Sequence, residues 1–191
     1  MYLKESNLTP PVGIDWDGNQ MKVNFRFILE VENNLITFGA QFPKECDALG
    51  KQGQFLEGLW EQSVVELFIH ELESARYLEI NLSPTGAYWC AEFSDYRVRK
   101  SELYLTPSIE TKLNDGITTA LMQIDIEDLI NGKFELAQAA ILKLGKGSFE
   151  EKIYLARKYA WGDSAKKALD CEPDFHQKKL VEVLSNYPPI I

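Results

Sequence analysis

An aromatic side chain and a carboxylate that could hold a ligand together occur in residues 59–69, Leu-Trp-Glu-Gln-Ser-Val-Val-Glu-Leu-Phe-Ile. If a loop leads into a strand here, Trp60 lies near the mouth of the strand, and Glu66 shares a face with His70. An indole ring stacks on the apolar face of a sugar ring, and a carboxylate accepts hydrogen bonds from sugar hydroxyls. The spacing therefore predicts a sugar-binding pair. The alternative is a core or rim tryptophan beside a solvated strand carboxylate.

Two further segments carry polar side chains at every second position, so within each segment these side chains share one face of a strand. The two sets are Tyr77, Glu79 and Asn81 in the first segment and Tyr88, Cys90 and Glu92 in the second. If these faces coincide with that of Glu66, one sheet presents carboxylates, an amide, phenols and an imidazole together. The alternative is the solvated side of a half-buried antiparallel sheet.

Alternation of apolar and polar residues predicts the strands that position these side chains. The predicted strands cover residues 23–31, 35–42, 64–70, 77–82, 87–93, 108–113, 117–124 and 134–142. Asn33-Asn34 and Asp115-Gly116 are typical of tight hairpin turns between neighbouring strands. The segment Pro43 to Leu59 is interpreted as a long loop, which in compact domains is often functional.

Helical patterns are short and few. Residues 126–130 predict one helical turn, and residues 149–160 could be helix or strand, because their apolar positions fit neither period cleanly. For residues 180–184, before Pro188-Pro189, a final strand is favoured over a short helix. Many short strands with turn signals and no alternation of helix and strand predict an all-β fold. We expect a single domain over residues 1–191, a two-sheet antiparallel β-sandwich, immunoglobulin-like or jelly-roll-like, with one or two short helices.

The composition of the chain restricts which classes of binding partner are expected. The 191 residues carry a formal net charge of -9, which disfavours nucleic acid and anionic membrane surfaces. No apolar run reaches the length of a signal peptide or a membrane span, so a cytoplasmic location is expected, or a secreted or periplasmic one if a leader was removed. Three widely spaced cysteines predict reduced thiols. A small neutral ligand is compatible with this charge, and the oligomeric state is left open.

Several sequence blocks resemble a known family. Trp60-Glu61-Gln62, followed by Val65-Glu-Leu-Phe-Ile69, resembles the tryptophan-glutamate-glutamine motif of the type-nine carbohydrate-binding modules. The runs at residues 77–89, 92–97 and 173–176 are similar to bacterial DOMON-like domains of the same superfamily. The resemblance implies a β-sandwich that binds a sugar, or haem in some DOMON relatives, without catalysing its conversion.

The resemblance also implies site residues. In the sugar-binding modules two aromatic rings clamp the ligand and a strand arginine hydrogen-bonds it, but Glu79 stands at the aligned position and reverses the charge. Arg97 is a candidate guanidinium from elsewhere, and Trp161 a candidate second aromatic ring. The predicted ligand-binding residues are Trp60, Glu66, Glu79, Asn81, Tyr88, Arg97, Trp161 and His176.

Other functions remain open at this point. The carboxylates of Glu66 and Glu79 would suit a glycosidase if their separation fits. No cofactor is expected; haem and calcium are the alternatives, with no metal ligands assigned for calcium. The candidate axial ligands of a haem are His70, His176, Met21 and Met122. The loop Pro43 to Leu59 could instead serve a protein-interaction module without a small ligand.

Overall fold

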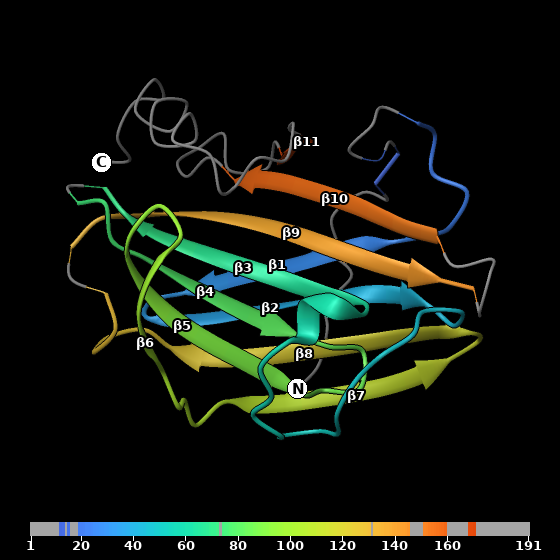
Figure 1. The fold of residues 1–191 in the computed structure, drawn as a ribbon, viewed down its shortest axis with the longest axis horizontal. Helices are drawn as coiled ribbons and strands as arrows, with labels where there is room; N and C mark the ends of the chain where they lie inside the picture. The colour runs from blue at the N-terminus through green and yellow to red at the C-terminus, as the bar shows by residue number, and fades with distance from the viewer. Residues whose placement is uncertain are drawn as a thin grey trace.

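Eleven strands form two antiparallel sheets in the part of the chain that the computed structural model describes, residues 12–13, 15, 19–72, 74–130, 132–145, 151–159 and 168–170. The smaller sheet has the order β1 (Arg26–Glu32), β2 (Leu35–Pro43), β8 (Ile117–Asp125) and β7 (Ser108–Asn114). The larger sheet has the order β11 (Ala168–Asp170), β10 (Glu151–Tyr159), β9 (Phe134–Leu144), β3 (Val64–Glu71), β4 (Tyr77–Leu82), β5 (Tyr88–Asp95) and β6 (Val98–Glu102). Figure 1 shows the two sheets stacked one over the other. The predicted β-sandwich is confirmed.

The core lies between the two sheets and explains why the strands alternate. Phe27 and Phe38 from the small sheet meet Leu67 and Ile80 from the large sheet, and all four side chains are fully buried. Such burial contributes about 1.5–3 kcal/mol per large apolar side chain. The remaining side chains of β3, β4 and β5 therefore point to the opposite, outer face of the large sheet.

One contact joins the two sheets, and another sets the spacing of two strands within the small sheet. The buried Gln138 on β9 donates from Nε2 to the backbone oxygen of Ile28 on β1, 3.1 Å away, which links the sheets. Within the small sheet, a Cβ at Gly39 would stand only 2.0 Å from the backbone oxygen of Ala120. Strands β2 and β8 therefore approach closely because position 39 has no side chain.

The hairpin predictions are confirmed at both turns. Asn33 joins β1 to β2 with φ of 55°, and Asp115-Gly116 joins β7 to β8 with φ of 48° and 78°. Strand β6 is not among the predicted strands, because its side chains are mostly exposed and show no apolar alternation. It pairs with β5 across a turn in which Arg97 has φ of 54°.

The helix predictions need correction. Within the described residues, the helical structure is one 3-10 turn, η2 (Leu59–Glu61), and there is no α-helix. Residues 126–130 form a turn closed by a hydrogen bond from Ile130 N to Ile126 O. Residues 151–159 are strand, which decides the open choice there in favour of strand, while 180–184 lie outside the described residues. No helix among the described residues is long and apolar enough to cross a bilayer.

Candidate functional site

A pocket of about 600 Å³ opens on the outer face of the large sheet, within the range typical of small-molecule sites. Strands β3, β4, β5, β6, β9 and β10, the turn before β6 and the segment before β3 all contribute to it. Its lining comprises Glu57, Trp60, Glu66, Glu79, Trp89, Phe93, Arg97, Arg99, Ala139, Ala140, Ile141, Tyr154 and Leu155. Aromatic rings, two buried carboxyls and two guanidiniums thus converge on one hollow.

Local backbone structure presents Trp60 to the pocket. Gly58, just before η2, has φ of 85°, a left-handed conformation that glycine adopts without strain. The preceding segment is fixed along β5, because Leu56 N donates to Tyr88 O and Tyr88 N donates to Gln54 O, both at 2.9 Å. The loop that carries Trp60 is therefore tied to the sheet that forms the rest of the pocket.

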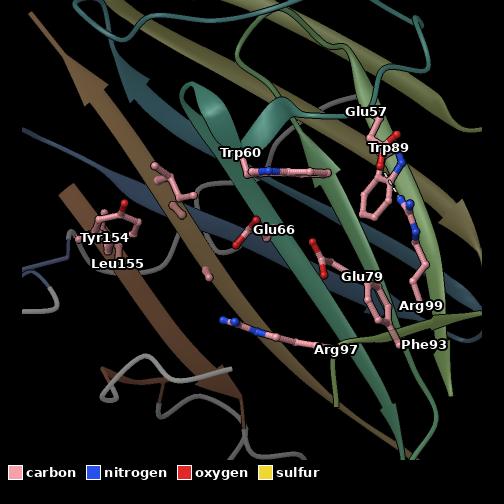
Figure 2. A pocket seen from close by; sticks show the side chains of 13 residues that line it. Glu57, Trp60, Glu66, Glu79, Trp89, Phe93, Arg97, Arg99, Tyr154 and Leu155 are labelled. Carbon is pink, nitrogen blue, oxygen red and sulfur yellow. Dashed lines mark hydrogen bonds and ion pairs between the residues drawn. The ribbon is translucent and has the colours of Figure 1, made fainter. Parts of the chain in front are cut away.

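Glu66 and Glu79 form the polar floor of the pocket. Strand pairing places Glu66 directly opposite Asn81, and Glu79 is two residues away from Asn81 on the same face. The side chains of Glu66 and Glu79 are 8% and 5% exposed, and Asn81 is fully buried. Asn81 Nδ2 donates to Glu79 Oε1 at 3.2 Å. Figure 2 shows both carboxyls between the Trp60 ring on one side and Arg97 on the other.

Burial controls the protonation of this pair. Burial and the negative charge of Glu79 raise the pKa of the Glu66 carboxyl well above its ordinary range. Burial also raises the pKa of Glu79, although the hydrogen bond from Asn81 and the charges of Arg97 and Arg99 act to lower it. The two carboxyls therefore hold protons at a pH where exposed glutamates have lost theirs.

Aromatic side chains of β5 form one side of the pocket. Trp89 donates from Nε1 to Glu102 Oε1 at 3.0 Å, and its ring meets Trp60 edge to face. Phe93 stacks on Tyr77 with ring centroids 4.6 Å apart and planes 5° from parallel. The opposite side is lower, because β9 carries Ala139 there. Large side chains beside a small one create the hollow.

Two arginines bring positive charge to the rim. Arg99 pairs with Glu57 at 2.5 Å and lies 3.8 Å from Glu102, and its guanidinium is 5.8 Å from the centre of the Trp89 ring. Arg97 lies at the β5–β6 turn, where its backbone N donates to the Tyr77 hydroxyl at 3.3 Å. Its side chain extends toward the two carboxyls (Figure 2).

The structure brings together five of the eight predicted ligand-binding residues. Trp60, Glu66, Glu79 and Arg97 line the pocket, and Asn81 lies beside the two carboxyls. Tyr88 belongs instead to the sandwich core, and its hydroxyl donates to Leu105 O at 2.8 Å. The expected coincidence of faces is therefore wrong for the third strand, where Tyr88 and Cys90 point inward. Trp161 and His176 lie outside the described residues.

Several pocket residues are absent from the predicted set. They are Glu57, Trp89, Phe93, Arg99 and Tyr154. A signal is present for two of them, because Trp89 and Phe93 alternate with Tyr88, Cys90 and Glu92 and so occupy the other face of the same strand. The polar alternation on this strand predicts that the face of Tyr88 and Cys90 lines the site, but the pocket is lined by the face of Trp89 and Phe93.

The structure describes three of the four candidate axial ligands of a haem. Met122 is buried in the core, Met21 packs against that core, and His70 lies on β3 with Nε2 3.0 Å from Ser74 O. His176 is outside the described residues. Among the residues described, no group of three or more histidine, cysteine, aspartate or glutamate side chains could hold a metal ion.

Comparison with known proteins finds similarity in structure but not in sequence. No protein-family model matches the chain, and no curated protein matches it significantly in sequence. A proposed carbohydrate-binding protein from Bacteroides uniformis ATCC 8492 matches in structure with a TM-score of 0.58 and 12% identity, over 78% of this chain and 76% of that one. A family 9 carbohydrate-binding module from Caldicellulosiruptor kristjanssonii, solved with cellotriose, gives a TM-score of 0.44 and 13% identity, over 85% and 76% of the two chains. The same module solved with glucose gives a TM-score of 0.46 and 12% identity, over 80% of this chain and 78% of that one. The first likeness supports the β-sandwich fold.

Proposed function

We propose that this protein is a non-catalytic carbohydrate-binding module that holds a mono- or oligosaccharide in the pocket on the outer face of the large sheet. One observation carries the proposal: Trp60 lies over two buried carboxyls in a single hollow. The ring would stack on the apolar face of a pyranose, and the carboxyls of Glu66 and Glu79 would hydrogen-bond its hydroxyls.

The surroundings of this pair support the proposal. Tryptophan, phenylalanine and tyrosine rings supply apolar surface, while Arg97 supplies donors for ring or hydroxyl oxygens. Similarity in fold to the protein from Bacteroides uniformis, itself proposed to bind carbohydrate, points the same way. The resemblance of the Trp60 segment to the type-nine carbohydrate-binding modules adds a reason from the sequence.

Binding is favoured over glycoside hydrolysis by the direction of the carboxyls. Glycosidases place two carboxyls on either side of the bond that breaks. Glu66 and Glu79 instead project from adjacent strands of one sheet and form a common floor. Such a floor can hold one face of a sugar but leaves the other face without an acid.

A glycan array followed by isothermal titration with the best saccharide tests this function. Trp60→Ala is expected to weaken binding at least about tenfold, because the stacking surface is lost. Glu66→Gln is expected to alter affinity while keeping the shape of the floor. Matched controls are Leu113→Ala and Glu32→Gln, which change exposed side chains of the small sheet.

Two results would overturn the proposal. The first is that the wild-type protein binds no saccharide on the array. The second is binding that both pocket variants retain in full. Chromatographic analysis of the bound saccharide accompanies the titration, because release of shorter products would assign catalysis to the same pocket.

A further inference from the structure

We propose that the pocket prefers a sugar that carries a primary amine, with the ammonium group held against Glu66 and Glu79 beside the Trp60 ring. This inference rests on the proposed function, since it names the class of sugar that the same pocket would select. Three properties of the described residues carry it: the balance of acceptors and donors, the net charge of the lining, and the position of an aromatic face.

Once they are ionised, the two carboxyls of the pocket floor offer more acceptors than the described residues supply donors for. Among the described residues, no hydrogen bond reaches the Glu66 carboxyl, and Glu79 receives one, from Asn81. Asn81 Oδ1, beneath the lining of the pocket, is buried and receives no hydrogen bond from the described residues. Asn81 stands directly opposite Glu66 on one side and Trp89 on the other, so this oxygen and the two carboxyls belong to one patch of the sheet.

An ammonium group complements such a patch better than a hydroxyl. It offers three N–H donors and no acceptor, whereas a hydroxyl offers one donor and two lone pairs that would face the carboxylates. Hydrogen bonds between charged partners are also shorter and stronger than neutral ones. The floor therefore favours an ammonium over the hydroxyl at the same ring position.

The charges of the residues that line the pocket also favour an ammonium group. Three carboxyls and two guanidiniums line the pocket, namely Glu57, Glu66, Glu79, Arg97 and Arg99. Glu57 and Arg99 are paired with each other, so the floor retains two carboxyls against Arg97. Fully ionised, the lining carries one surplus negative charge, which a single ammonium would neutralise. A sugar acid would instead add a charge of the same sign as the floor.

Trp60 supplies the third property. Its ring lies next to both carboxyls, as Figure 2 shows. A cation over an indole face gains about 0.5–2 kcal/mol, most when it is shielded from water. The raised pKa of both carboxyls fits this arrangement, since their protons stand in for the positive charge that a bound ammonium would bring.

Titration calorimetry with four related sugars tests the inference on the unmodified protein. Glucosamine is expected to bind at least about tenfold more tightly than glucose or N-acetylglucosamine, with glucuronate weakest. The preference is expected to shrink as sodium chloride is added, because charges at the mouth of an open pocket are screened. A preference that salt leaves unchanged would contradict the ionic contact.

The outcomes separate this inference from the proposed function. Equal binding of glucose and glucosamine, or tighter binding of glucuronate, overturns the amine preference and leaves sugar binding intact. No binding of any of the four sugars overturns the amine preference, and silence across the glycan array as well overturns the proposed function.

Variants provide a second, independent test. Glu66→Gln and Glu79→Gln preserve side-chain shape but remove the negative charge. Each is expected to lower the ratio of glucosamine to glucose affinity several-fold, while glucose affinity changes less. Glu32→Gln on the small sheet serves as the matched control and should leave the ratio unchanged. Retention of the full ratio in both pocket variants would contradict the placement of the amine.

Discussion

The indole ring of Trp60 meets that of Trp89 edge to face, with ring centroids 5.1 Å apart and planes inclined by 70°. Trp89 is only 2% exposed, and its Nε1 is bonded to Glu102. Trp60 is half-buried and lies along the edge of the pocket (Figure 2). One tryptophan is therefore mainly part of the scaffold, while the other offers its surface to a ligand.

This division predicts different effects of two equivalent substitutions. Trp89→Ala should lower the free energy of unfolding by about 3–5 kcal/mol, as expected for a large buried aromatic side chain. Trp60→Ala should lower it by clearly less, because its ring is half-buried. Denaturation in guanidinium chloride measures both. The prediction fails if Trp60→Ala is the more damaging change.

A second prediction concerns the small sheet. Gly39→Ala should destabilise the protein by about 1–3 kcal/mol or more, since the added methyl group would overlap the Ala120 backbone oxygen. Thermal unfolding followed by circular dichroism measures the effect. Gly53→Ala is a useful comparison, because no heavy atom lies within 4 Å of the place its added Cβ would take and only its φ of 76° opposes the change. Equal stability of Gly39→Ala and wild type would refute the close approach of β2 and β8.

A third prediction concerns pH. Because the pKa of Glu66 is raised on folding, the folded protein binds more protons than the unfolded chain above about pH 4.3. This carboxyl therefore reduces stability as pH rises from there through its raised pKa. Glu66→Gln cannot ionise, so its stability relative to wild type should improve by more than about 1 kcal/mol between about pH 5 and pH 9. Urea unfolding across this range tests the sign, with Glu32→Gln as the control. A constant difference between Glu66→Gln and wild type would show that Glu66 has an ordinary pKa.

A fourth prediction separates stability from binding at Arg97. This residue has φ of 54°, a conformation that costs a residue other than glycine about 1 kcal/mol or more. Arg97→Gly should therefore keep or raise the melting temperature, while it weakens sugar binding by removing the guanidinium. Parallel thermal melts and calorimetric titrations check this. Loss of stability together with unchanged affinity would assign Arg97 to the scaffold.

Much of the fold is predictable because alternation is local. The strands containing Phe27, Phe38 and Leu67 each turn one apolar face into the core between the sheets, so their period is visible in the sequence. Strand β6 is not predictable in this way. Its residues, such as Lys100, lie at an exposed sheet edge, and its position depends on pairing with β5.

The site is predictable in part for the same reason. Alternation places Glu66 and Glu79 on faces that the sheet brings together, and pairing between β3 and β4 confirms this neighbourhood. Alternation cannot decide which face of β5 joins them, because that depends on where the second sheet packs. The sequence therefore favours Tyr88 where Trp89 lines the pocket. Contributions from Tyr154 depend on β9–β10 pairing, which no local pattern reveals.

Sugar binding on the outer face of the large sheet, above Glu66 and Glu79, can be observed residue by residue in solution. The measurement is nuclear magnetic resonance of the ¹⁵N-labelled protein during titration with glucosamine, and separately with glucose. A Trp60→Phe variant assigns the indole signal of Trp60. We expect shifts of that signal and of the β3, β4 and β5 amides around the pocket, with β1, β2, β7 and β8 unchanged. Shifts confined to the small sheet, or none with either sugar, would contradict binding in this pocket.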